Sequence, residues 1–190
     1  MKRFAIILIS ICLIGVISAN SQTTNSESDR NLGGLRVGYH NANILLDGSK
    51  SSSGLEGFYV GYFRNTNIIP RLDYGYGLEY FQNGYSYSDG AERICHTLSI
   101  PLDLKFIVGP AFALGGFATN FVVSEKIKTD DENISPQDSD KTNWFDLAFF
   151  LGGGVKFSFV TIEARYHWGL LEARTEYYNR YFQIGAGFSF

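Results

Sequence analysis

Hydrophobic and polar residues alternate with a period of two along most of the chain after about residue 34. The clearest example is the final segment, Tyr181–Phe190. Its apolar positions are Phe182, Ile184, Ala186, Phe188 and Phe190, and its small or polar positions are Gln183, Gly185, Gly187 and Ser189. This period is that of a β-strand with one apolar and one polar face. The pattern therefore predicts strands, and it continues to the aromatic carboxy terminus.

Seven further segments show a comparable strand pattern, which makes eight predicted strands. They are Gly34–Asn41, Leu55–Arg64, Leu72–Tyr80, Ile94–Phe106, Ala111–Val123, Trp144–Phe159 and Thr161–Leu170. Ala111–Val123 is apolar on both faces, so the pattern leaves the orientation of this strand open. Pro101 cannot donate a hydrogen bond to a neighbouring strand, and we expect a bulge or a local break there.

The connections between these strands alternate in length. Long polar links are expected at Asn43–Ser53, Asn83–Arg93, Ser124–Asn143 and Leu171–Asn179, and short links at Asn65–Ile69, Val108–Pro110 and Phe159–Val160. Outer-membrane barrels combine an even strand number with short periplasmic turns and longer outer loops. The sequence therefore predicts an all-β fold, an eight-stranded antiparallel up-and-down transmembrane β-barrel over residues 34–190, with both termini in the periplasm.

A soluble lipocalin-type barrel would show the same alternation with the two faces exchanged. Two features favour the membrane. The polar face is crowded with glycine, as expected for the narrow lumen of a small barrel, and lacks the many charges of a soluble surface. The apolar face carries aromatic residues near the strand ends, as in interfacial girdles. These residues are Tyr62, Tyr80, Trp144, Phe159, Trp168 and Phe182.

The amino terminus has the three parts of a secretory signal peptide. Met1–Arg3 is positively charged, Phe4–Ile17 is apolar, and Ala19 and Ser21 are small residues placed for cleavage before Gln22. A membrane anchor is the alternative, but the apolar run is short and no basic stop-transfer cluster follows it. We therefore expect residues 1–21 to be cleaved, a short segment at 22–33, and export to the outer membrane of a Gram-negative cell.

Charge and cysteine content exclude several classes of ligand. From Gln22 onward the chain has 14 basic and 19 acidic side chains, a net charge of −5, so no nucleic-acid binding is expected. Cys95 would be the sole cysteine after cleavage, which excludes an internal disulfide and a multi-cysteine zinc site. The acidic run Asp130-Asp131-Glu132 lacks the spacing of an EF-hand. We predict no metal-ligating and no cofactor-binding residue.

Two function classes remain open. The first is a non-enzymatic barrel with a structural, binding or secretion-accessory role, whose outer loops form the contact surface. The second is a lipid-modifying enzyme of the lipid A deacylase or acyltransferase kind, which would need a nucleophile beside a base. His96 and Ser99 are three residues apart and so lie on opposite faces of one strand, and His167 has no serine beside it on its own strand. We therefore predict no catalytic residue. A pore is disfavoured because side chains fill an eight-stranded lumen.

Several segments, in order, resemble the PorT-like outer-membrane β-barrel family of Bacteroidetes-type bacteria. They are Leu98-Ser-Ile-Pro-Leu-Asp-Leu-Lys105, Gly77-Leu-Glu-Tyr80, Asp146 through Gly152-Gly-Gly-Val155, Ala164-Arg-Tyr-His-Trp-Gly-Leu170 and the final strand ending at Phe190. The resemblance implies an outer-membrane barrel in contact with outer-membrane lipid and lipopolysaccharide. It also implies that the barrel-assembly machinery reads the carboxy-terminal strand through Phe190.

The positions that share the polar face predict a charged network inside the barrel. If the hairpin is symmetric about Phe159–Val160, Lys156 faces Glu163. Gly154 then faces Arg165, and Gly152 faces His167. Buried charges persist only when they are paired, so we expect Lys156, Glu163 and Arg165 in one network. Asp146 and Asp103 are further candidate members.

Overall fold

All regular structure in the described residues is β-strand. The computed structural model describes residues 32–46, 49–50, 53–86, 92–128, 133–134, 143–174 and 177–190. The strands are β1 Leu32–Leu46, β2 Ser49–Lys50, β3 Ser53–Ile69, β4 Leu72–Ser86, β5 Glu92–Val108, β6 Ala111–Lys128, β7 Asn133–Ile134, β8 Phe145–Phe157, β9 Val160–Arg174 and β10 Tyr177–Ser189. Among these residues there is no helix with the length and apolar character of a membrane span.

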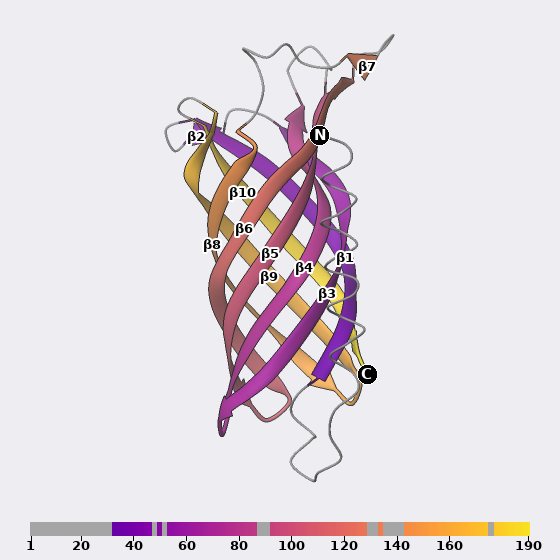
Figure 1. Cartoon of the computed structure of the whole chain (residues 1–190), viewed down its shortest axis with the longest axis vertical. Helices are drawn as coiled ribbons and strands as arrows, with labels where there is room; N and C mark the ends of the chain where they lie inside the picture. The colour runs from indigo at the N-terminus through magenta and orange to yellow at the C-terminus, as the bar shows by residue number, and fades with distance from the viewer. Residues whose placement is uncertain are drawn as a thin grey trace.

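Eight long strands form one closed antiparallel sheet. Each long strand pairs with the next long strand along the chain, and β10 pairs with β1 from Gly34↔Ser189 to Leu46↔Tyr177. The two-residue strands β2 and β7 extend the β1 and β6 ladders at one end of the barrel (Figure 1). The predicted fold, an eight-stranded up-and-down barrel, is confirmed.

The two ends of the barrel differ in their connections. At one end, here called the turn end, three hairpins close with the two-residue turns Pro70–Arg71, Gly109–Pro110 and Ser158–Phe159. At the other, the loop end, the links span residues 47–52, 87–91, 129–144 and 175–176. β1 starts and β10 finishes at the turn end, where the Phe190 amide donates a hydrogen bond to Gly33 O at 2.9 Å.

Most strands are longer than the sequence pattern predicted. The predicted long link Leu171–Asn179 is wrong in extent, because β9 continues to Arg174 and β10 starts at Tyr177. The hydrophobic pattern ends where the apolar face ends, whereas ladder hydrogen bonds form equally well between polar residues. β1 likewise begins at Leu32, two residues before the expected start of the barrel. The expected signal peptide, residues 1–21, and residues 129–132 and 135–142 of the expected third loop lie outside the described residues.

Two of the three turns are displaced from their predicted positions, whereas Gly109–Pro110 lies within the predicted link Val108–Pro110. Asn65–Ile69 is strand, and the turn follows it at Pro70–Arg71, with proline before a residue at φ 73° as in a type II turn. The predicted turn at Phe159–Val160 is wrong by one residue. Phe157 pairs with Val160, and Ser158 takes the positive φ of 55°. A β-branched residue such as Val160 is disfavoured at positive φ.

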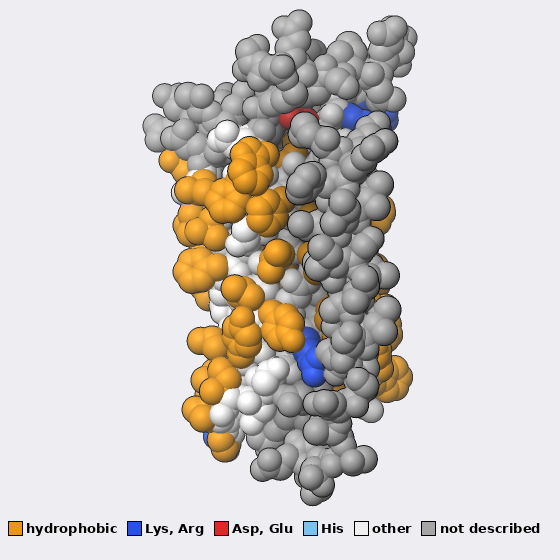
Figure 2. Space-filling view, in the orientation of Figure 1, with side chains coloured by type: hydrophobic (Ala, Val, Ile, Leu, Met, Phe, Trp, Pro, Cys, Tyr) orange, Lys and Arg blue, Asp and Glu red, His pale blue; other side chains and the backbone are white. Residues whose placement is uncertain are grey.

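The two faces of the wall have the polarity of a membrane barrel. Leu35, Phe58 and Leu104 point outward and are 52, 56 and 50% exposed, whereas most polar side chains of the intervening positions are buried. Figure 2 shows hydrophobic side chains spread over the visible outer wall between the two ends. Because the apolar face points out and the polar face points in, the lipocalin-type alternative is wrong.

The structure settles two strands that the pattern left uncertain. In β6, Phe112 and Leu114 point into the lumen and are buried, and Phe117 points outward. In β5, Pro101 faces inward. The ladder to β4 is interrupted between the pairs Tyr76↔Leu102 and Glu79↔Ser99, and it continues in the same register on both sides. The expected local break is therefore present, without a bulge at that position. A register shift in β5 does occur at His96/Thr97, on the side facing β6.

Candidate functional site: the filled lumen and the turn-end cavity

A layer of paired charges crosses the lumen between its middle and the turn end. Arg165 Nη2 donates a hydrogen bond to Glu79 Oε1 at 2.8 Å, and its Nε lies 3.1 Å from Glu163 Oε1. Arg36 Nη1 bridges the same carboxylates, 2.8 Å from Glu163 Oε1 and 3.3 Å from Glu79 Oε1. Lys105 Nζ lies 3.8 Å from Glu163 Oε2. The five side chains come from β1, β4, β5 and β9, so this layer joins opposite walls of the barrel.

Inward-facing aromatic rings lie over the cations of this layer. Such contacts stabilise a cation that has lost its water. The pairs are Arg36 with Phe63 at 4.7 Å, Lys105 with Phe112 at 4.5 Å, and Arg165 with Tyr59 at 5.6 Å and Phe150 at 5.8 Å, each measured to the ring centroid.

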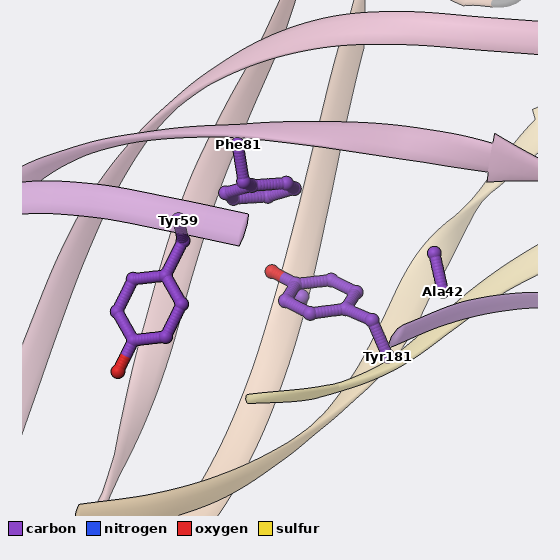
Figure 3. Packing of buried hydrophobic residues seen from close by; sticks show 5 residues of the cluster. Ala42, Tyr59, Phe81 and Tyr181 are labelled. Atoms are coloured by element: carbon purple, nitrogen blue, oxygen red, sulfur yellow. The ribbon is translucent and has the colours of Figure 1, made fainter. Parts of the chain in front are cut away.

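A column of stacked rings fills the lumen next to the charged layer. His167 stacks between Phe150 and Tyr181, with ring centroids 4.7 and 4.1 Å away. Tyr181 in turn packs against His40 at 5.1 Å and Phe81 at 5.2 Å. Figure 3 shows the Phe81 and Tyr181 rings lying one above the other inside the barrel. These rings come from five strands and close the lumen.

Polar side chains continue the filling toward the loop end. Asp146 Oδ2 accepts hydrogen bonds from Asn179 Nδ2 at 3.1 Å and Asn120 Nδ2 at 3.4 Å. The Asn120 amide is also 3.2 Å from the Tyr181 hydroxyl. The cavity that remains at the charged layer measures about 10 Å³, the size needed for a single water molecule. At the charged layer the lumen therefore has room for no more than about one water molecule.

The turn end is hollow instead. A cavity of about 530 Å³ opens there, within the size range of small-molecule sites. Its lining includes the basic residues Arg71, Lys105 and Lys156, one carboxylate, Asp73, and a set of neutral polar residues. That set is Asn65, Asn67, Ser158, Thr161 and Ser189. Phe112 and Ile107 contribute apolar lining.

The predicted network is right in part. Glu163 and Arg165 do belong to one buried cluster, as expected. The predicted facing pairs Gly154–Arg165 and Gly152–His167 are wrong, because Gly152 faces Arg165, where a Cβ would lie 2.8 Å from Arg165 Cγ, and Phe150 faces His167. The predicted pairing of Lys156 with Glu163 is wrong, because the shifted turn places Lys156 opposite Thr161 and Gly154 opposite Glu163. Lys156 instead lines the turn-end cavity.

Of the two further candidates, Asp146 lies elsewhere, in the amide cluster near the loop end. Asp103 lies beside the charged layer and interacts electrostatically with Lys105, Arg36, Glu163 and Arg165, but its Oδ1 has no hydrogen-bond partner within the described part of the chain. The other members of the network are Arg36, Glu79 and Lys105, which the sequence pattern did not predict as members. The alternation in the sequence shows that these side chains point inward. It does not show the stagger between strands that brings them together.

The candidate catalytic residues do not come together. His96 lies on the outer face, where its Nδ1 is hydrogen-bonded to the Tyr80 hydroxyl, whereas Ser99 is buried on the inner face. His167 is held in the ring column. In the segments that the structure describes, no group of three His, Cys, Asp or Glu side chains is arranged to hold a metal ion.

The comparisons with known proteins agree with this fold. No family model and no curated protein matches the sequence. Among solved structures, the chain is similar to Ail, the attachment invasion locus protein of Yersinia pestis, in its complex with the heparin analogue sucrose octasulfate. The TM-score is 0.54 and the identity 17%, over 85% of this chain and 99% of Ail. Neisserial surface protein A, NspA, is similar with a TM-score of 0.54 and 12% identity, over 83% of this chain and 95% of NspA. At these identities the similarity shows the fold, that of an eight-stranded outer-membrane barrel.

Proposed function

We propose that this chain is a non-enzymatic integral outer-membrane protein whose loop end is its contact surface. The observation that carries the proposal is the combination of an apolar outer wall with a lumen filled by paired charges and stacked rings. An apolar band around a closed barrel suits a bilayer. A filled lumen leaves the two ends as the surfaces available for binding.

A lipid-modifying enzyme is the alternative. It would need a serine, or another nucleophile, within hydrogen-bond reach of a base on the lipid-facing surface. His96 is the histidine of the outer face, and it is bonded to Tyr80, with Ser99 on the opposite side of the wall. This arrangement favours the non-enzymatic function.

The charge of the loop end limits which partner it can take. The links carry eight acidic residues and two lysines. The acids are Asp47, Asp89, Asp130, Asp131, Glu132, Asp138, Asp140 and Glu176, and the lysines are Lys50 and Lys141. Links with this excess of acidic residues disfavour a sulfated glycan such as the heparin analogue bound by Ail. We therefore propose a cationic or neutral partner at the loop end.

We also propose that the chain is a member of the PorT-like family, because the motifs of that family occur in it in the same order.

Labelling of single cysteines tests the orientation. In Asp138→Cys, the new thiol should react with a membrane-impermeant maleimide on intact cells, because its link joins β6 and β8 at the loop end. In Ser158→Cys, at the turn end, labelling should require permeabilised outer membranes. The wild-type chain is the matched control, since Cys95 is 5% exposed and should stay unlabelled while the barrel is folded. The reverse labelling pattern would show the opposite orientation.

Deletion of Phe190 tests the proposed reading of the last strand by the assembly machinery. The deletion removes little packing, because Phe190 is 79% exposed, and a single backbone hydrogen bond, from the Phe190 amide to Gly33 O. Purified protein should therefore refold in detergent as well as wild type, while the amount of folded barrel in cells falls. The two quantities are measured by heat-modifiable mobility on gels. An equal loss of folded barrel in detergent and in cells would indicate a stability defect. No loss of folded barrel in either would contradict recognition of Phe190 by the assembly machinery.

A further inference from the structure

The cavity at the turn end carries an excess of positive charge. Arg71, Lys105 and Lys156 line it together with a single carboxylate, Asp73. Asp73 Oδ1 already accepts a hydrogen bond from Asn67 Nδ2 at 2.9 Å. Lys105 is buried at the inner limit of the cavity, near Glu163, while Lys156 is only partly buried and forms no ion pair among the described residues. Arg71 and Lys156 therefore have charge available for a ligand.

The backbone at this end is unusual in a second way. In the described chain, the residues other than glycine with positive φ are Arg71 and Ser158, and both line the cavity. The left-handed region is strained for residues with a Cβ and unstrained for glycine. In the remaining turn the residue with positive φ is Gly109, at φ 60°, in the same first position of the turn as Ser158. Strain of this kind collects at functional sites. Two of three turns thus keep a polar side chain at a position where glycine would be more stable.

We propose that the turn-end cavity is a binding site for a compact anionic group, a phosphate or a carboxylate, held between Arg71 and Lys156 with Lys105 beneath. Thr161, Ser158 and Ser189 supply hydroxyl groups that donate hydrogen bonds to the same anion. Bonds from charged donors are the stronger ones, and a site that combines them with a cavity can hold a small anion against water.

The proposed orientation of the barrel determines only the compartment from which the ligand binds. With the turn end in the periplasm, the anion is either a soluble periplasmic molecule or the headgroup of an anionic phospholipid in the inner leaflet. Binding to the purified barrel does not depend on the orientation, so failure of one proposal leaves the other standing.

Calorimetric titration of the folded full-length mature barrel in a neutral detergent tests the site, with pyrophosphate and citrate as probes. Wild type should bind at least one of them. Lys156→Gln should weaken that binding about tenfold, as expected for loss of one charge-assisted contact. Arg71→Gly should also weaken binding, while its urea midpoint equals or exceeds that of wild type because the strained turn is relieved.

The matched control is Lys126→Gln, an exposed lysine on β6 at the loop end, which should bind the probes as wild type does. Absence of binding by wild type would overturn the proposal, as would equal weakening in the Lys126 and Lys156 variants. Repeating the titration in nanodiscs with and without phosphatidylglycerol separates the two sources. Weaker probe binding in the anionic discs identifies the headgroup as the occupant, and equal binding identifies a soluble anion.

Discussion

Arg165→Ala should lower the free energy of unfolding by about 3–5 kcal/mol, the cost of removing one partner from a buried charge cluster. Arg165 is 1% exposed and pairs with both Glu79 and Glu163. Its removal leaves Arg36 as the one arginine shared by the two carboxylates and deprives Tyr59 of its cation. The measurement is urea unfolding of the refolded barrel in detergent, with the free energy obtained by linear extrapolation.

A double-mutant cycle separates the charge effect from lost packing. Glu79→Gln removes one of the two negative charges that Arg165 neutralises, so the double variant with Arg165→Ala should lose less than the sum of the two single losses. Lys126→Gln, at an exposed site, serves as the control and should change stability by less than about 0.5 kcal/mol. An unchanged unfolding midpoint in Arg165→Ala would show that the charged layer does not hold the barrel together.

Leu151→Arg should destabilise the inserted barrel by about 2–4 kcal/mol, as expected for arginine at the bilayer midplane. Leu151 points outward from β8, midway between the outward aromatic residues Phe145 and Phe157. The cost arises because the new guanidinium must lie in hydrocarbon, or draw water and headgroups to itself. Folding into lipid vesicles at increasing urea concentrations measures this loss.

Val123→Arg is the matched control for the lipid-facing position. Val123 is 61% exposed on β6, two residues beyond Phe121, whose ring stacks with that of Trp144 at the loop-end rim. Arginine near the interface should cost about 0–1 kcal/mol. If both variants lose the same free energy, the outer wall does not face a bilayer in the proposed way.

The period of two was sufficient to predict the strand number and the direction of the faces. Because successive side chains of a strand point to opposite sides, the inward parity of Arg36, Glu79, Glu163 and Arg165 followed from the sequence alone. Excess glycine on that face indicated a narrow lumen, and the filled interior is consistent with it. The sequence pattern could not indicate where each strand ended, since the ladders continue past the apolar band into polar residues such as those of β9 and β10.

The composition of the lumen network depended on geometry that no local pattern contains. A two-residue shift in the β8–β9 register moved Lys156 away from Glu163, and the cause was one residue in the turn, Ser158 at positive φ. The turn was hard to place because Phe-Val and Ser-Phe are both poor matches to the favoured hairpin sequences.

The sequence by itself determined which side chains enter the barrel and which face outward in seven of the eight strands. Tertiary structure decided the eighth, β6, because a strand with two apolar faces is oriented by its neighbours, here by Phe112 under Lys105. It also decided which inward residues meet, since strand tilt and register bring Arg36 of β1 and Glu79 of β4 together across the lumen. Parity is a property of one strand and can be read locally, whereas contact across a barrel depends on the register of all the strands between the two residues.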